Sequence, residues 1–440
     1  MSDLSTPLTA ERLPLGYEQD WYQANTRGGT GAHKNVRISF RILGPLVPEA
    51  LDEVVRRFTA RHDALQLQPL PGPDGTGTTG QYLRPLGAGE PVMLRESVTA
   101  RSAEQFSRYA SALLSRDFTA PWAGDGDRPF RVRLLRYEPD HHALLATFQN
   151  LVFDGRAHHL FASELWRDYQ ALVQGDPVPD TAPSFAAAVA RQRTGFGPEH
   201  LARARASWRK RLEFAARHPW RQPASAAPTE GGTLRIELPA RAWPALRERC
   251  AEARCSVSQW VIAAFVRAVA GQAGLRRVAL WTTMDSRGFR DRDLVGMLAG
   301  TCPVAVRDPA AALPAVLAEV RARLLEALRY QQLTAAELHG LAAELAAGGG
   351  ASLARDIFVS LRRFDGEYPV TREQRALRIT ADAYPLRRIA FTGSAALHLR
   401  CTEFRDRLLI DLTFDGPRVG RLLAQAIADQ LGNDLMTDRP

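Results

Sequence analysis

The segment 128–172 restricts the fold most strongly, because it joins two apolar strands and a helix without a long linker. The stretch "RPFRVRLLRYEPDHHALLATFQNLVF" predicts two strands joined by a turn at Glu138 to Asp140. The next stretch predicts a helix with one apolar face, made of Phe161, Leu165, Trp166, Tyr169 and Leu172. A strand pair followed directly by an amphipathic helix indicates a mixed α/β fold.

Strands and helices alternate in both halves of the chain. Residues 33–44 read as a strand and 48–65 as a helix. Strands near 356–361, 395–402 and 407–414 precede a closing helix that starts at Arg418. A chain of 440 residues suits two domains of roughly 200 residues. The proline-rich stretch "QGDPVPDTAPSF" marks the boundary, so we predict one lobe at 1–178 and a second at 179–440.

The composition favours a cytoplasmic protein without nucleic-acid or membrane partners. The net charge of +9 comes from scattered arginines that form no dense basic run. No apolar run reaches the ~18 to 20 residues of a membrane span. The first residues, "MSDLSTPLTAERLPLG", lack the basic and apolar regions of a signal peptide.

Several common catalytic and metal-binding patterns are missing from the sequence. It contains no P-loop, no G-x-S-x-G and no H-E-x-x-H. Its four cysteines include no C-x-x-C pair. A strand between His141-His142 and His158-His159 would separate these pairs by roughly 35 Å. We therefore predict no metal site, and interpret both histidine pairs as exposed or half-buried.

Two amides interrupt the apolar run "ALLATFQNLVFDG". Gln149 and Asn150 alternate to opposite faces, and both faces are otherwise apolar. Buried amides cost a few kcal/mol unless they are hydrogen-bonded. One interpretation is that they bond locally, cap the strand end or face a solvent channel. The other is that one of them faces a substrate channel at the strand end.

The sequence resembles the condensation domains of nonribosomal peptide synthetases along nearly its whole length. Their signature H-H-x-x-x-D-G corresponds to Gln149 through Gly155, "QNLVFDG". Six further stretches are similar to the family in the right order: "LGYEQDWY", "LDEVVRRFTARHDAL", "RPFRVRLLR", "SVSQWVIAAFVRAVAGQAG", "MDSRGFRDRDLVGMLAGTCPVAVR" and "DLTFDGPRVGRLLAQAIADQL". The last of them resembles the closing strand and helix. The resemblance implies an α/β (α+β) fold of two chloramphenicol-acetyltransferase-like lobes, arranged as a V-shaped pseudo-dimer with a central tunnel.

The resemblance also implies the site. Gln149 and Asn150 stand in place of the two signature histidines, the second of which normally assists the acceptor amine. Asp154 would pair with Arg287 of the later Gly-Arg motif and have a mainly structural role. Gln149, Asn150, Asp154 and Gly155 are thus the catalytic candidates. The substrate-binding candidates are His158, Arg287, Cys302 and His398.

Three functions remain open. The first, which we favour, is a stand-alone acyltransferase that acts on an acyl thioester and an amine or other small acceptor. The thioester would be held on the phosphopantetheine of a peptidyl or acyl carrier protein, with no cofactor bound by the chain, which we expect to be a monomer. The second is a scaffold that binds a carrier protein or recruits a tailoring enzyme. The third is another reaction on a carrier-bound substrate, such as cyclisation or elimination.

Overall fold

The chain folds into two compact units, each assembled from separate stretches of sequence. The computed structural model describes residues 11–24, 35–71, 78–122, 127–220, 230–239, 241–347, 355–363, 377–385, 395–404 and 407–436. The first unit comprises Met1–Gly195, Arg287–Ala299 and Asp365–Phe391. The second comprises Phe196–Ser286, Gly300–Phe364 and Thr392–Pro440.

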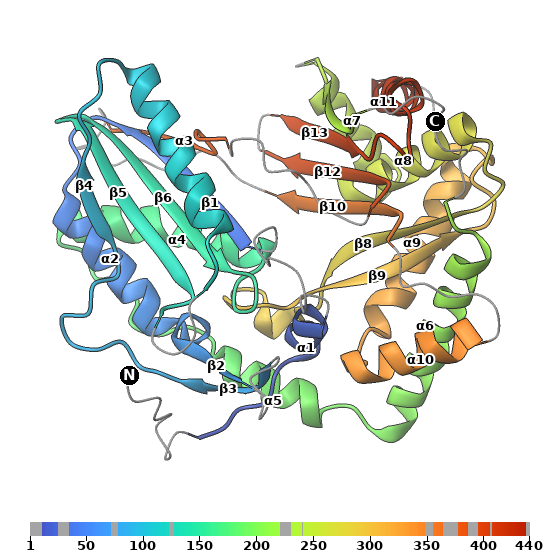
Figure 1. Cartoon of the computed structure of the whole chain (residues 1–440), viewed down its shortest axis with the longest axis horizontal. Coiled ribbons are helices and arrows are strands. Elements are labelled where there is room, and N and C mark those ends of the chain that lie inside the picture. The colour runs from blue at the N-terminus through green and yellow to red at the C-terminus, as the bar shows by residue number, and fades with distance from the viewer. Residues whose placement is uncertain are drawn as a thin grey trace. The chain divides into compact units, whose positions relative to one another are not determined.

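A five-stranded sheet forms the centre of the first unit (Figure 1). Its strand order is β11 (Arg378–Ala381), β1 (Asn35–Leu43), β6 (His141–Gln149), β5 (Phe130–Glu138) and β4 (Leu94–Ser97). The central strand β6 runs antiparallel to both β1 and β5. Every residue of β6 from His142 to Phe148 is buried. This burial on both faces of the strand accounts for its continuous apolar run.

Helices cover both faces of this sheet. On one side α2 (Pro48–Arg61) packs against α4 (Gly155–Gln174). On the other, α3 (Ala103–Thr119) lies across β6, β1 and β5, as Figure 1 shows in cyan. The unit also contains α1 (Tyr17–Ala24), α5 (Phe185–Thr194), the 3-10 helix η2 (Asp63–Gln66) and the hairpin of β2 (Leu67–Pro71) and β3 (Thr78–Leu83).

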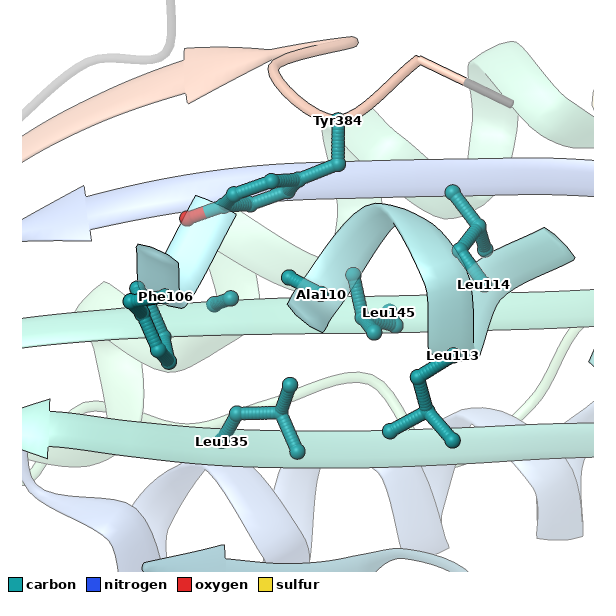
Figure 2. Close-up of a cluster of buried hydrophobic side chains, with 8 residues drawn as sticks. Phe106, Ala110, Leu113, Leu114, Leu135, Leu145 and Tyr384 are labelled. Atoms are coloured by element: carbon teal, nitrogen blue, oxygen red, sulfur yellow. The ribbon is translucent and has the colours of Figure 1, made fainter. Parts of the chain in front are cut away.

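One buried cluster ties a late segment of the chain to this early sheet. Phe106 and Leu114 of α3 pack over Leu145 of β6, and Tyr384 joins them from the residues that follow β11 (Figure 2). The Phe106 and Tyr384 rings meet edge to face with centroids 6.4 Å apart. The core of the first unit therefore includes a side chain that lies more than 200 residues downstream in sequence.

The second unit contains a six-stranded sheet. Its order is β7 (Gly232–Glu237), β13 (Leu408–Phe414), β12 (Leu397–Glu403), β10 (Ile357–Arg363), β8 (Val278–Asp285) and β9 (Ala299–Val306). The strictly alternating burial of β13 shows that one face of the sheet is the core face. The helices of this unit are α6 (Pro198–Arg217), α7 (Ala242–Glu252), α8 (Val257–Ala273), α9 (Leu313–Arg329), α10 (Ala335–Ala347) and α11 (Arg421–Met436).

The predicted mixture of strands and helices is confirmed, including the two strands and the helix of segment 128–172. The first stretch of the first unit runs beyond residue 178, the expected boundary, to Gly195. The reason is that Asp63 accepts hydrogen bonds from the Phe185 and Ala186 backbone N–H groups and holds α5 to this unit. In the described part of the chain, no helix combines the length and hydropathy needed to cross a membrane.

Candidate functional site

The stretch "QNLVFDG" forms the turn between β6 and α4. Phe153 at its end stacks on Phe148 of β6, with ring centroids 3.9 Å apart and planes 8° apart. The carbonyl of Leu151 accepts a hydrogen bond of 2.9 Å from the buried side chain of Gln19 on α1. Aromatic packing and this bond fix the backbone of the turn.

Asp154 is the most densely bonded residue of the turn, with its side chain only 1% exposed. It is the N-cap of α4, and its Oδ1 accepts from the backbone N–H groups of Arg156 and Ala157 at 3.0 and 2.9 Å. Its Oδ2 accepts from the Leu298 N–H at 2.9 Å. Asp154 thus caps the helix and also binds the segment 287–299.

The predicted ion pair between Asp154 and Arg287 is present and bidentate. Nη1 and Nη2 of Arg287 lie 2.8 and 3.0 Å from Oδ2 and Oδ1 of Asp154. The guanidinium also donates to the carbonyls of Leu294 and Gly296, both at 3.0 Å. Because these bonds occupy a side chain that is 2% exposed, Arg287 is placed to hold its own segment against the turn.

Gly296 allows this segment to approach the core closely. A Cβ atom at this position would lie 2.1 Å from the ring of Phe185, which is fully buried. Only a residue without a side chain can therefore occupy the position without moving the ring. We call the set Asp154, Arg287, Gly296 and Leu298 the latch; all four belong to the first unit.

The side chains of Gln149 and Asn150 are held less firmly than that of Asp154. Gln149 is the last residue of β6 and Asn150 the first of the turn, and both are partly exposed. Only the backbone of Gln149 is engaged: its N–H donates to Pro129 O, and its carbonyl accepts from Val152 N. Among the described residues, neither side chain has a hydrogen-bond partner. The interpretation that the two side chains bond locally is therefore wrong within the described residues, and the cap of α4 is Asp154. That one of them faces a solvent or substrate channel stays a prediction.

Two more candidates lie in the first turns of α4. Gly155 is its first residue, and a Cβ atom there would have nothing within 4 Å. His158 is buried, and its N–H donates to the Asp154 carbonyl at 3.0 Å. Open space thus adjoins the backbone of Gly155, whereas His158 is buried.

The other two candidates, Cys302 and His398, belong to the second unit. Cys302 lies on β9, and burial raises the pKa of its thiol to about 12 against the opposing charge of Arg211. His398 lies on β12, where its Nε2 and the Ser360 Oγ are 2.9 Å apart. Burial lowers the pKa of His398 to about 3. Cys302 is therefore a protonated thiol and His398 a neutral imidazole near pH 7.

The paired histidines around the turn correct one prediction. His142 and His158 are buried, whereas their neighbours His141 and His159 are half-buried as predicted. His142 belongs to the run of β6 that is buried on both faces, and His158 follows the buried residue Ala157 on α4. The buried pattern of the strand and of the helix therefore includes a histidine. Within the described ranges, no three His, Cys, Asp or Glu side chains are grouped to bind a metal ion.

The sequence reasoning missed a second pair of amides, Gln19 and Gln81, which is buried and bonds to the backbone of the turn through Gln19. Gln19 and Gln81 bond to each other at 2.9 Å, and Gln81 also donates to the carbonyl of Pro14. Both side chains are at most 1% exposed. Gln19 falls inside the motif-like stretch "LGYEQDWY", where a polar residue at a buried helix position was the available signal.

The outer face of α4 borders a polar cavity of about 440 Å³ that was also missed. Arg61, Arg156 and Arg167 line it, together with Glu164 and Asp293. Burial alone would raise the pKa of Glu164, but the neighbouring His62 and Arg61 outweigh it and leave that pKa lowered. Asp168 is buried beside Arg61. With it, the three arginines named here have three neighbouring carboxylates.

Comparison with known proteins places these features in a family. The sequence profile of the condensation domain matches residues 12–358. Phosphinothricin tripeptide synthetase PhsC of Streptomyces viridochromogenes is 27% identical over 341 residues, which are 73% of this chain and 30% of PhsC. The chain thus spans less than a third of the length of this relative.

Two solved structures share the fold. The first condensation domain of the calcium-dependent antibiotic synthetase, in complex with a substrate analogue, aligns with a TM-score of 0.73 at 18% identity, covering 98% of both chains. The X-domain in its complex with OxyB from teicoplanin biosynthesis aligns with a TM-score of 0.71 at 21% identity, covering 99% of this chain and 95% of that one. At these identities the likeness is one of fold. With the profile match over most of its length, the chain belongs to the condensation-domain family.

Proposed function

We propose that the chain is a condensation-type acyltransferase that joins a carrier-bound acyl thioester to an amine or another nucleophile. Condensation domains are in general acyltransferases, and the chain belongs to their family. The observation that carries the proposal is the intact latch, in which Asp154 and Arg287 fix the turn. The Asn150 side chain meanwhile stays partly exposed and has no hydrogen-bond partner among the residues that the structure describes.

The proposed chemistry uses Asn150 without a general base. An amide cannot accept a proton near neutral pH, so Asn150 does not deprotonate the acceptor. Its carbonyl can accept a hydrogen bond from the amine, and its NH₂ can donate to the oxyanion that forms on the thioester carbonyl. The amine nitrogen then forms the C–N bond and the C–S bond breaks. The sulfur leaves as a thiolate and receives, through water, the proton that the amine nitrogen loses. Positioning of two reactive partners supplies the acceleration.

The experiment measures product by mass spectrometry from an acyl-loaded carrier protein and a panel of amines. Asn150→Ala is expected to lower turnover by about 10²- to 10³-fold, as loss of an oxyanion donor does. Asn150→His is expected to make turnover rise with pH through about 6.5, since only neutral imidazole accepts a proton. Gln149→Ala serves as the matched amide control. If product formation is indifferent to both Asn150 changes, this residue has no part in the mechanism.

A second function is a scaffold that recruits a carrier protein or a tailoring enzyme. It is supported by the two amides, since neither can perform the proton transfer for which the family signature carries histidine. The solved complex of the X-domain with OxyB gives this alternative a precedent in the same fold. In the same assay, no turnover together with retention of a carrier or enzyme partner on the immobilised chain would favour the scaffold. Turnover without any retained partner would exclude it. A rearranged carrier-bound product would instead indicate cyclisation or elimination.

A further inference from the structure

Cys250 and Cys255 meet at the end of α7, in the second unit. The Cys255 N–H donates to the Cys250 carbonyl at 2.9 Å, and the Arg254 N–H donates to the Ala251 carbonyl at 3.0 Å. These two bonds define a Schellman motif, the usual way in which a helix ends on a left-handed residue. Cys250 and Cys255 occupy the two positions of this motif whose side chains contact each other.

The backbone holds this arrangement although the usual glycine is missing. The left-handed residue is Arg254, with a φ of 49°, a conformation that costs a non-glycine residue roughly 1 kcal/mol or more. Arg321 of α9 donates to the Arg254 carbonyl at 3.3 Å and supports the turn from outside. Two residues after Arg254, Ser256 caps the start of α8 and forms a complete capping box with Gln259. The turn is therefore fixed from both sides.

We infer that Cys250 and Cys255 are a site of oxidative modification, at which a hydroperoxide converts the two thiols into an intramolecular disulfide. The bond of 2.9 Å from the Cys255 N–H to the Cys250 carbonyl holds the two residues at adjoining positions of the motif in the reduced protein. Cys250 is buried, whereas Cys255 is partly exposed and is the thiol that an oxidant reaches first. The disulfide would join the end of α7 covalently to the residue that precedes α8.

The reaction balances with one hydroperoxide for each disulfide. The Cys255 thiolate attacks a peroxide oxygen, the O–O bond breaks, and a sulfenic acid forms. The Cys250 sulfur then attacks the sulfenic sulfur, the S–S bond forms, and the S–O bond breaks. The hydroxyl leaves as water with the second thiol proton, so two sulfurs are oxidised and one peroxide is reduced. Burial raises the pKa of both thiols, so the reaction is expected to quicken as pH rises.

The test treats the whole reduced protein with hydrogen peroxide at several pH values, alkylates the remaining thiols and digests with trypsin. Cleavage after Arg249, Arg254 and Arg267 leaves the two cysteines on separate peptides. The expected product is a linked pair of these peptides that a reductant separates. It should be lost in Cys250→Ser and Cys255→Ser and retained in a Cys302→Ser, Cys401→Ser control. Linkage to another cysteine, linkage between two chains, or oxidised but unlinked Cys255 would overturn the proposal.

Two variants of Arg254 test whether the Schellman motif brings the two thiols together, or whether their closeness in sequence is enough. Arg254→Gly suits a positive φ and should retain the linkage. Arg254→Pro has a negative φ and no N–H group, so it removes the motif while leaving both thiols, and linkage should be lost. Because trypsin no longer cleaves at residue 254 in these variants, cleavage after Glu252 is used to separate the cysteines. Equal rates of linkage in both variants would show that the motif does not bring the thiols together.

Discussion

The two ends of "QNLVFDG" are held in opposite ways. The carboxylate of Asp154 accepts five hydrogen bonds, from Arg287, Leu298 and the first turn of α4. Four residues earlier, Asn150 has a side chain that is partly exposed and makes no hydrogen bond within the described part of the chain. The contrast teaches that the two ends differ in role. Asp154 is fully engaged in holding the turn, and Asn150 is the end that would meet a substrate under the proposed function.

The largest expected effect is loss of the latch. Arg287→Ala leaves a buried carboxylate without its counter-ion and should lower the free energy of unfolding by about 3 to 5 kcal/mol. Arg156→Ala is the matched control, since this arginine contacts the same segment through the Arg292 carbonyl but is 38% exposed. The control should cost less than about 1 kcal/mol. Urea denaturation measures both, and equal losses would show that burial of the pair has no special weight.

A smaller loss of stability is expected when a methyl group is added inside the latch. Gly296→Ala forces its new methyl group against the Phe185 ring and should cost about 1 to 3 kcal/mol, as overpacking of a core does. Gly288→Ala lies in the same segment with open space around its Cα, so its stability should hardly change. Indifference to Gly296→Ala would mean that the Phe185 ring can move aside freely.

At Gly155 an alanine substitution should raise the free energy of unfolding, whereas the substitutions in the latch lower it. An alanine fits the open space at this first helical residue and should raise the free energy of unfolding by about 0.4 to 1 kcal/mol, because it restricts the unfolded chain. Turnover measured on the same variant should fall, since Gly155 is one of the catalytic candidates and the methyl group would fill open space beside the turn that carries Asn150. A variant that is both more stable and fully active would remove Gly155 from the substrate path.

The smallest effect on stability is expected at the amides. Asn150→Ala and Gln149→Ala remove side chains that have no hydrogen-bond partner in the described ranges, so each should change the free energy of unfolding by less than about 0.5 kcal/mol. Thermal or urea unfolding of the two variants beside Asp154→Ala measures the contrast directly. A loss at Asn150 comparable to that at Asp154 would mean that both ends of the turn serve the fold.

The parts of the fold set by local sequence were predictable, and the parts set by distant contacts were not. Continuous or alternating hydrophobicity identified β5, β6 and α4, and the family resemblance identified the partner of Asp154. The strand β4 was missed because all four of its residues are exposed and carry no pattern. β11 was missed because four residues define it, and only its pairing with β1 makes it a strand. The contact of Gly296 with Phe185 depends on two segments about 110 residues apart, which no local pattern encodes.

The late strand β11 has a consequence for how the protein is made. Residues 378–381 complete the sheet edge at β1, Asp382 pairs with Arg37, and Tyr384 fills the cluster under α3. Until these residues leave the ribosome, a nascent chain that already contains all of 1–195 has an open strand edge at β1 and an incomplete cluster under α3. Its Asp154 carboxylate gains Arg287 earlier, with the second of the three segments. The first unit can therefore be completed only after residues from its last segment, which lies beyond most of the second unit in sequence, have been made. A recombination event that exchanges this unit between relatives must move three separate segments of the gene together.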